Sequence, residues 1–258
     1  MSEARVVAIA NQKGGVGKTT TAVNVGAYLA LGVRVLLVDL DPQANATSSL
    51  GIDVAGVELS TYEALLGEAP LREAIVATRQ EQLHLAPSSR ALAGAQVELV
   101  EVDGREYRLR RALEDVRGDY DVILIDCPPS LGILTVNGLV AADVVLSPVQ
   151  CEYLALEGVA QLMETIELVR ATLNPRLELL GMVMTMFDPR TKLSTQVVEE
   201  VRRHFPDRTF DTVIPRSVRL SEAPSFGKPV LEYEPASRGA AAYADLAQEL
   251  IRRGVLRG

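Results

Sequence analysis

Short apolar segments alternate with longer amphipathic segments along most of the chain. The apolar segments are rich in Val, Ile and Leu without polar alternation, which is typical of strands buried on both faces of a parallel sheet. Strands are predicted at Arg5–Ala10, Arg34–Asp39, Leu83–Pro87, Asp121–Asp126, Asp143–Val149 and Leu177–Thr185. Helices are predicted at Lys18–Leu31, Ser89–Val100, Tyr107–Val116, Leu131–Ala141, Leu156–Thr172, Leu193–His204 and Ser237–Arg253. This alternation predicts an α/β fold: one domain over residues 1–258, with a single doubly wound, mostly parallel sheet and helices on both faces.

The composition is that of an ordinary globular protein. The 258 residues are 48% hydrophobic and 23% charged, which excludes disordered, collagenous and disulfide-rich classes. Only Cys127 and Cys151 are cysteines, as expected in a reducing compartment. We expect neither a signal peptide nor a membrane span, because the run Val6–Ala10 is too short and the uncharged stretch Cys127–Ala142 contains a Pro-Pro pair. A cytoplasmic protein is therefore predicted.

The charges are distributed unevenly. The chain has 26 Lys and Arg against 34 Asp and Glu, a net charge of −8 that argues against a protein coating nucleic acid. Residues 188–258, however, hold 12 basic and 10 acidic side chains. Only four basic residues are lysines, namely Lys13, Lys18, Lys192 and Lys228. The positive charge is thus concentrated late in the chain, and two lysines lie five residues apart near its start.

The segment Lys13–Thr20, KGGVGKTT, stands between the first predicted strand and the first predicted helix. Glycines allow the backbone N–H groups to approach an anion closely, and a helix N-terminus favours negative charge. Lys18 can reach the β- and γ-phosphates of a nucleotide, and the Thr19 hydroxyl can hold Mg²⁺. The segment therefore predicts a phosphate-binding loop for ATP, formed by Lys13, Gly14, Gly15, Val16, Gly17, Lys18, Thr19 and Thr20.

The loop departs from the general phosphate-loop pattern at its start. Gln12 stands where that pattern has glycine, and the additional Lys13 follows at once. This form resembles the deviant Walker A loop of the ParA/MinD group of ATPases. The resemblance implies a homodimer in which Lys13 of each subunit crosses to the phosphates bound by the other. Such a lysine would stabilise charge in trans, as an arginine finger does in other phosphoryl-transfer enzymes.

Three aspartates end predicted strands, where ligands of open α/β sheets bind. Asp126 closes an apolar run and is predicted to hold Mg²⁺ as a Walker B carboxylate. Asp39 and Asp41 follow the second strand and can divide the work between metal and attacking water. In the resembled group, the position of Asp41 orients the hydrolytic water and that of Asp39 lies near the metal. We therefore expect Lys13, Lys18 and Asp41 to be catalytic, and Thr19, Asp39 and Asp126 to serve the metal.

Longer segments resemble the Soj/ParA branch, which segregates chromosomes and plasmids. They are VDLDPQAN (38–45), the stretch from Leu124 to Val159, and VIPRSVRLSEAPSFGKPV (213–230). The resemblance places Pro215 and Ser217 near the adenine base, although family members often have asparagine where Ser217 stands. It also implies that Pro148–Gly158 belongs to a switch or interface region.

The resemblance further implies partners. In this branch the ATP-bound dimer binds double-stranded DNA without sequence preference, and a ParB-type centromere-binding protein stimulates slow hydrolysis. Arg190 and Arg219 match the DNA-binding positions, with Lys192, Arg216 and Lys228 as plausible neighbours. A nucleoid-associated protein without stable membrane association follows. The chain starts close to its first strand, so we expect no helix-turn-helix extension.

Two alternatives remain open from the sequence. A MinD-like membrane cycle needs a terminal amphipathic helix, and Leu246, Leu250 and Ile251 have helical spacing near the C-terminus. A helix packed on the domain is the other interpretation of that segment. An electron-transfer protein like the nitrogenase iron protein would need Cys127 and Cys151 to bind an iron–sulfur cluster between subunits. Small residues packed near the site are the other interpretation of the cysteines.

Overall fold

The computed structural model describes residues 3–153 and 155–256. Their strands form one sheet in the order β3-β4-β2-β5-β1-β6-β7-β8. All neighbouring pairs are parallel except β3 with β4. The strands are β1 (Arg5–Ile9), β2 (Val35–Asp39), β3 (Val76–Ala77), β4 (Leu83–Ala86), β5 (Val122–Asp126), β6 (Val144–Gln150), β7 (Glu178–Phe187) and β8 (Thr209–Pro215). The predicted α/β class and mostly parallel sheet are confirmed.

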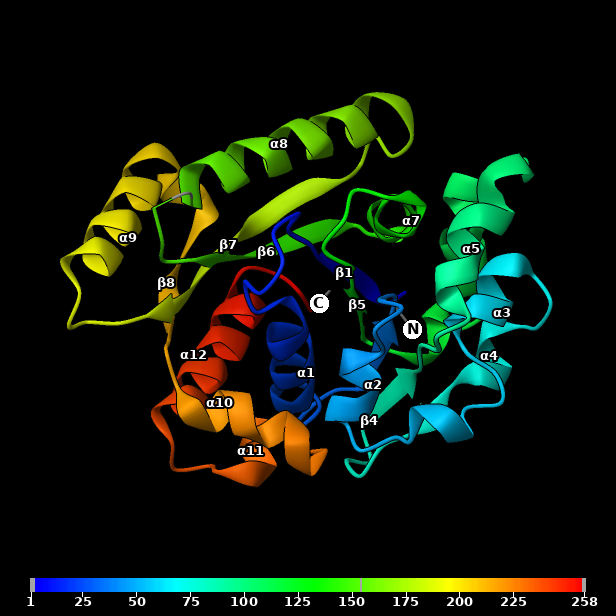
Figure 1. Ribbon diagram of the computed structural model, residues 1–258, viewed down its shortest axis with the longest axis horizontal. Coiled ribbons are helices and arrows are strands. Elements are labelled where there is room, and N and C mark those ends of the chain that lie inside the picture. The colour runs from blue at the N-terminus through cyan, green and yellow to red at the C-terminus, as the bar shows by residue number, and fades with distance from the viewer. Residues whose placement is uncertain (1–2, 154, 257–258) are drawn as a thin grey trace.

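Helices connect the strands and cover both faces of the sheet (Figure 1). The α-helices are α1 (Lys18–Leu29), α2 (Asn45–Ser49), α3 (Thr61–Leu66), α4 (Leu71–Ala74), α5 (Leu92–Glu98), α6 (Arg108–Glu114), α7 (Ile133–Ala141), α8 (Ala155–Thr172), α9 (Lys192–His204), α10 (Val218–Glu222), α11 (Val230–Tyr233) and α12 (Arg238–Arg252). Single 3-10 turns lie at Val54–Gly56, Leu99–Glu101, Arg105–Tyr107, Arg117–Asp119, Pro206–Arg208 and Ala223–Phe226. Leu154, within the predicted interface segment Pro148–Gly158, lies outside the described residues, as do residues 1–2 and 257–258 of the predicted domain.

Two hydrophobic cores lie on opposite faces of the sheet. Val6 and Ala8 of β1 belong to the core that α5, α6, α7 and α8 cover. Val7 and Ile9 of the same strand belong to the core under α1 and α12. Because successive strand side chains point to opposite faces, a strand buried on both sides needs apolar residues at every position. This double burial explains why β1 reads as one continuous apolar run.

Strand β8 was missed by the sequence analysis. It is an edge strand with polar residues in its middle, where Asp211 is exposed. Its backbone N–H groups at Asp211 and Thr212 donate to the Glu249 carboxylate of α12, at 2.9 Å each. A charged side chain from a distant helix thus satisfies the open edge, which local periodicity does not reveal.

The region between β2 and β4 also lacked a prediction. It folds into the short helices α2, α3 and α4, of five, six and four residues. Helices this short show no full apolar period, so the pattern that identified the longer helices was absent. Of the longer helices, α5 is shorter than the predicted Ser89–Val100 because a 3-10 turn at Leu99–Glu101 follows it.

Candidate active site

The loop between β1 and α1 has the backbone expected of a phosphate-binding loop. Gly15 and Gly17 have φ of +75° and +92°, in the left-handed region that favours glycine. Gly17 is also the N-cap of α1 and offers no side chain to the helix. The first N–H groups of α1 therefore remain available to an anion, where the helix dipole also favours negative charge.

The two loop lysines have different surroundings. Lys18 is 7% exposed, and its Nζ donates to the Lys13 carbonyl oxygen at 2.9 Å. Burial lowers the pKa of Lys18, while Asp126, Cys127 and Asp41 favour its charged form. The Lys13 ammonium forms an ion pair with Glu152, just after β6 in the same chain, and its side chain is 39% exposed. Lys18 thus points inward along the loop, and Lys13 lies at the surface.

Asp39 and Asp126 lie side by side at the carboxyl ends of β2 and β5, which pair in register. Asp39 is fully satisfied: it accepts hydrogen bonds from the Thr47 N–H and hydroxyl at 2.8 and 2.7 Å and from the Asp41 N–H at 3.2 Å. Burial raises the pKa of Asp39 to about 6, against the lowering effect of these hydrogen bonds. This carboxylate orders the loop that leads into α2.

The Asp126 carboxylate, unlike that of Asp39, lacks hydrogen-bond partners among the described residues. Both of its carboxylate oxygens are buried, and within residues 3–153 and 155–256 neither has a hydrogen-bond partner. Burial and then the neighbouring Asp39 raise the pKa of Asp126 well above its usual range, while Thr19 and Lys18 oppose the rise. An unpartnered buried carboxylate is costly unless a cation compensates it. The site therefore fits Mg²⁺, with Asp126 and the Thr19 hydroxyl as the residues that would hold it, directly or through water.

Asp41 lies two residues beyond β2 and is 8% exposed. Its carboxylate accepts a hydrogen bond from the Gln43 N–H at 2.9 Å, and its carbonyl oxygen accepts one from the Ser88 hydroxyl. The loop turns sharply after it, since Ala44 has φ of +52°. Asp41 is thus held close to Lys18, to which it is electrostatically coupled. The predicted roles of Asp41 and of Asp39 stay predictions.

A cavity of about 410 Å³ opens beside the loop. Gly17 and Thr20 line it from the loop side, and Pro215 and Ser217 line it from the segment after β8. The two residues predicted near the base are therefore brought to the phosphate loop, with room for a purine beside it. The sequence analysis missed Met186, Tyr243, Thr185 and Leu220, which also line the cavity. Met186, with φ of +53°, is the second-last residue of β7, whose apolar pattern gave no chemical signal.

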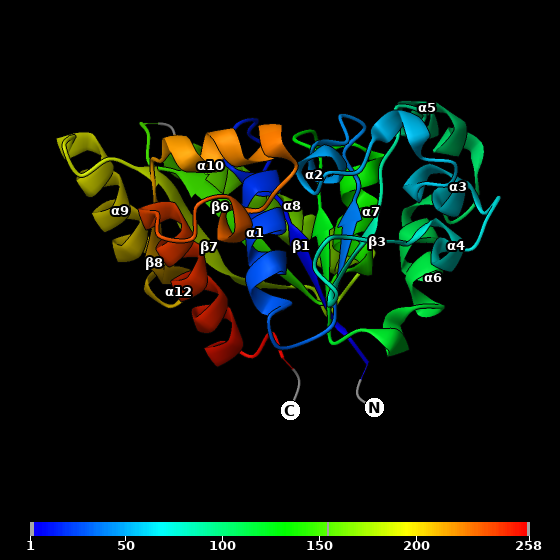
Figure 2. The same ribbon diagram turned by 90° about the horizontal axis from the view of Figure 1, so that it is seen from below.

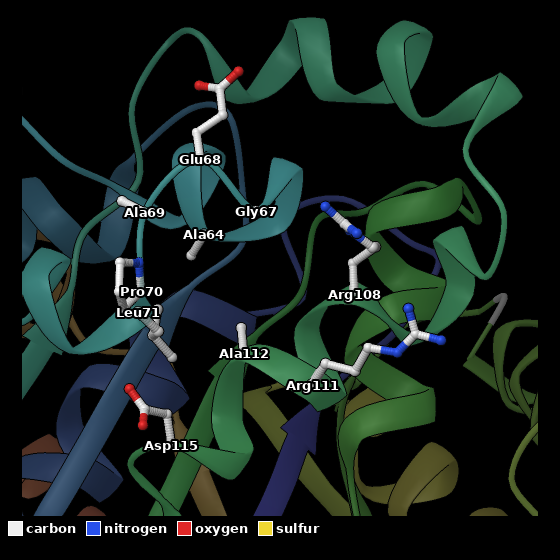
Figure 3. Close-up of a pocket in the computed structure, with 10 residues that line it drawn as sticks. All are labelled: Ala64, Gly67, Glu68, Ala69, Pro70, Leu71, Arg108, Arg111, Ala112 and Asp115. Atoms are coloured by element: carbon white, nitrogen blue, oxygen red, sulfur yellow. The ribbon is translucent and has the colours of Figure 1, made fainter.

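A larger cavity, of about 500 Å³, lies elsewhere, between α6 and the α3–α4 turn (Figure 3). Arg108 and Arg111 border it together with Glu68 and Asp115, so it has no consistent charge. The Arg108 guanidinium donates hydrogen bonds to the Leu65 and Leu66 carbonyl oxygens at the end of α3. Since none of the predicted site residues lines this cavity, we place the active site at the phosphate loop.

The residues predicted to bind DNA divide into two places. The segments after β7 and β8 lie together, because the Arg216 N–H donates to the Phe187 carbonyl oxygen at 2.9 Å. The segments that carry Arg190 and Lys192 after β7, and Arg216 and Arg219 after β8, therefore lie at the same edge of the sheet as the phosphate loop; α10 and the start of α1 lie at that end in Figure 2. Lys228 is separate and lines a cavity of about 270 Å³ with Thr19, Asn24 and Ser48.

Both arginines carried over from the family are paired with acids of the same chain. Arg190 contacts both oxygens of Asp188 at 2.9 and 2.7 Å, and its side chain is 85% exposed. Arg219 pairs with Glu222 at 2.8 Å. The Arg190 hydrogen bond lowers the pKa of Asp188 to about 2. The pairs are exposed, and exposed pairs of this type are weak.

The structure decides between the alternatives for the cysteines. Cys127 is 1% and Cys151 7% exposed, so neither presents a thiol to another subunit. Burial raises the pKa of both thiols, to about 12 for Cys151. Both are packed side chains, in conflict with the iron–sulfur alternative.

The C-terminal helix also packs on the domain. Leu246 and Leu250 of α12 are buried in the core they share with α1, and only Ile251 of the three is exposed, at 44%. The interpretation as a packed terminal helix is confirmed. Over the part of the chain that the structure describes, no helix has both the length and the apolar character to cross a bilayer.

Known proteins resemble this chain over nearly its whole length. A profile of the AAA domain family matches residues 4–179. The sporulation initiation inhibitor protein Soj of Bacillus subtilis is 57% identical over 251 residues, covering 97% of this chain and 99% of Soj. The chromosome partitioning protein ParA of Caulobacter vibrioides is 56% identical over 252 residues, covering 96% and 94%.

Solved structures agree in fold. A cobyrinic acid a,c-diamide synthase of Mycobacterium smegmatis, solved with ADP and magnesium and also with an ATP analogue and magnesium, is 45% identical with a TM-score of 0.85. The comparison with the ADP complex covers 96% of this chain and 94% of that one. The cell division ATPase MinD of Pyrococcus furiosus is 25% identical, with a TM-score of 0.78 and coverage of 96% and 98%.

The doubly wound sheet, the glycine-rich loop with its additional lysine and the strand-end aspartates define a phosphate-loop ATPase of the deviant Walker A type. Within that class, the chain belongs to the ParA/Soj family of chromosome partitioning ATPases, as its full-length identity to Soj and ParA shows. The predicted ligands, ATP and Mg²⁺, are those of the ATP-analogue complex of the 45% identical relative.

Proposed function

We propose that this protein is an ATP-driven switch for DNA partitioning. ATP binding closes two subunits face to face, the closed dimer binds double-stranded DNA without sequence preference, and slow hydrolysis reopens it. A ParB-type centromere-binding protein stimulates the hydrolysis. One ParA-type domain over residues 1–258 carries the cycle, which takes place in the cytoplasm on the nucleoid. Full-length identity to partitioning proteins supports this proposal.

In the proposed reaction, the loop N–H groups and Lys18 bind the phosphates of ATP. Thr19 and Asp126 would hold Mg²⁺, which would supply charge neutralisation at the phosphate oxygens. Asp41 orients a water, whose oxygen bonds to the γ-phosphorus as the bond to the bridging oxygen of ADP breaks. Lys13 of the second subunit stabilises the charge on the transferring group. Because hydrolysis needs this second subunit, it is coupled to dimer closure.

The observation that carries the proposal is the position of Lys13. Its main chain belongs to the phosphate loop, yet its ammonium lies at the surface beside Glu152 and not in the loop of its own chain. Lys18 already occupies the inner position at the Lys13 carbonyl oxygen. This position supports the proposal that Lys13 acts on the phosphates bound by a second copy of this chain.

DNA co-sedimentation with ATP, with ADP and without nucleotide tests the switch. We expect DNA to retain the protein only with ATP, and retention to fall steeply with added salt because the contacts are to phosphates. Retention independent of nucleotide would contradict the proposal. Capture by anionic lipid vesicles with ATP, without affinity for DNA, would instead favour the MinD-like membrane cycle.

Lys13→Ala tests the crossing lysine. We expect the variant to bind ATP nearly as the parent does, because Lys18 and the loop N–H groups remain, but to stay monomeric with ATP and to hydrolyse it at least about tenfold more slowly. Sedimentation velocity and a phosphate-release assay measure the two effects. A variant that dimerises normally would remove the crossing role.

Asp41→Ala tests the water-orienting carboxylate. Hydrolysis should fall by about 100-fold, while ATP binding and dimer closure persist, because Asp41 does not line the cavity beside the loop. The ATP-bound dimer should then stay on DNA after dilution. Rapid release from DNA would refute this role for Asp41.

A further inference from the structure

Gln12 stands directly before Lys13, where the general phosphate-loop pattern has glycine, and the proposed reaction assigns it no role. Its side-chain amide Nε2 donates to the Thr165 hydroxyl of α8 at 2.6 Å and lies 3.3 Å from the Gln161 carbonyl oxygen. The Thr165 hydroxyl in turn donates to the same carbonyl oxygen at 2.9 Å. Thr165 is 5% exposed, so this contact is built into the helix and not made by chance at the surface.

The residues next to Gln12 are held by elements from the same part of the chain. The Asn11 side chain donates to the Pro148 carbonyl oxygen of β6 at 2.8 Å and accepts a hydrogen bond from the Lys13 N–H at 3.0 Å. At the other end of the loop, the Thr185 hydroxyl of β7 donates to the Val16 carbonyl oxygen at 2.8 Å. The unit β6–α8–β7 thus anchors the loop at both ends (Figure 1).

Both polar main-chain groups of Lys13 have hydrogen-bond partners in the loop. Its N–H is bonded to Asn11, and its carbonyl oxygen accepts from the Lys18 ammonium at 2.9 Å. Among residues 3–153 and 155–256, its long side chain is held only by the ion pair with Glu152. A flexible side chain can reach a target outside the subunit efficiently only when its base is held in one orientation.

We propose that Gln12 is a positioning residue for Lys13: its bond to Thr165 of α8 holds the base of the lysine so that the ammonium is directed out of its own subunit. Glycine at this position would lack the bond. The inference rests on the proposed crossing of Lys13 between subunits.

The test uses Thr165, which lies outside the phosphate loop. Thr165→Val keeps the shape and removes the hydroxyl, and Thr165→Ser keeps the hydroxyl as the matched control. For Thr165→Val we expect kcat for ATP hydrolysis and the fraction of ATP-bound dimer to fall about fivefold, the factor that one net hydrogen bond is worth. Affinity of the monomer for ATP should change less than twofold, and Thr165→Ser should behave as the parent.

A double variant separates positioning from a general structural role. If the Gln12–Thr165 bond acts through Lys13, then Lys13→Ala with Thr165→Val should hydrolyse ATP no more slowly than Lys13→Ala alone. Additive losses, a parallel loss of ATP affinity, or a Thr165→Val variant with parental kcat would each overturn the inference. Should Thr165→Val not fold, Gln12→Gly replaces it with the same expectations.

These variants distinguish failure of the positioning role of Gln12 from failure of the proposed function. If Lys13→Ala itself dimerises and hydrolyses ATP as the parent does, the crossing lysine fails and the positioning role fails with it. If Lys13→Ala is inactive and both Thr165→Val and Gln12→Gly match the parent, only the positioning role is overturned.

Discussion

Two buried aspartates on neighbouring strands have opposite relations to the fold. Asp39 accepts three hydrogen bonds and orders the loop toward α2. Asp126, in register beside it, has none from the described residues. A buried carboxylate without partners lowers the stability of the folded protein, whereas the three donors at Asp39 offset part of the same burial cost, although its pKa remains raised to about 6. Of the two aspartates, Asp126, the residue predicted to hold Mg²⁺, is therefore the one whose burial costs more folding free energy.

Substituting these two aspartates should change stability in opposite directions. Without nucleotide, at a pH above the folded-state pKa of Asp126, Asp126→Asn should raise the free energy of unfolding by about 1–3 kcal/mol, because it removes a buried charge that Lys18 and Thr19 offset only in part. Asp39→Asn should lower it by about 1–2 kcal/mol, because the amide cannot accept all three hydrogen bonds. Thermal or urea unfolding measures both changes.

The gain for Asp126→Asn should also depend on pH. The raised pKa of Asp126 means that acid protonates it in the folded state and removes the charge without any substitution. The advantage of the variant over the parent should therefore shrink as the pH falls through the folded-state pKa of Asp126. A variant less stable than the parent both above and below that pKa would show that Asp126 has partners in solution.

At the edge of the sheet, the open backbone groups of strand β8 are hydrogen-bonded by side chains of the distant C-terminal segment. Strand β8 has its open edge satisfied by Glu249 of α12, which accepts from Asp211 and Thr212. Arg253, one turn later, donates to the Thr209 carbonyl oxygen and lies over the Phe210 ring, 4.1 Å from its centre. Helix α12 thus fixes β8, whose following segment carries Pro215 and Ser217 to the cavity beside the phosphate loop.

Glu249→Gln should weaken the contact between α12 and β8 and so lower the stability of the protein. Burial acts to raise the pKa of Glu249, but the hydrogen bonds from Thr212 and Asp211 and the charge of Arg253 lower it overall. The carboxylate therefore contributes stability above its unfolded-state pKa, and the contribution is lost as the pH falls through the folded-state value.

We expect Glu249→Gln to destabilise the protein by about 2 kcal/mol near neutral pH, because an amide oxygen replaces a charged acceptor of several hydrogen bonds. The difference from the parent should narrow as the pH falls below about 4.5 and through the lowered folded-state pKa, where the parent carboxylate becomes neutral. Unfolding curves in urea across this range measure it. A constant difference at every pH would exclude the charge as the cause.

The charges of the whole molecule oppose the DNA binding proposed for it. The chain carries a net charge of −8, and even Arg190 and Arg219 are paired with Asp188 and Glu222. Binding a phosphate at either arginine therefore means replacing a carboxylate of the same chain. A modest affinity per subunit follows, so that two subunits joined by ATP would be needed to hold DNA firmly.

Releasing one of these arginines should strengthen DNA binding. Asp188→Asn removes the acid that holds Arg190, and we expect DNA affinity of the ATP-bound protein to rise about threefold at low salt, with a steeper salt dependence. The matched control is Glu200→Gln, which frees Arg203 from the same kind of ion pair on α9. Fluorescence anisotropy with labelled duplex DNA measures both. Equal gains for the two variants would show that only net charge matters.

The local sequence was sufficient for the features that depend on neighbouring residues. Buried parallel strands are apolar at every position, and a loop that approaches phosphate needs glycines at fixed spacing, so β1, β5 and Lys13–Thr20 could be predicted directly. Asp39, Asp41 and Asp126 were recognised as strand-end carboxylates for the same reason.

Tertiary structure decided what depends on contacts between distant segments. Only the folded loop after β2 gives Asp39 its hydrogen bonds from Asp41 and Thr47, whereas Asp126 beside it on β5 accepts none from the described residues. Only the approach of α8 to the loop gives Gln12 a partner, 153 residues away. Strand β8 and the cavity lined by Met186 and Tyr243 likewise require distant elements to meet. Whether a polar group is buried and hydrogen-bonded depends on such contacts between distant segments, and the periodicity of the sequence does not reveal it.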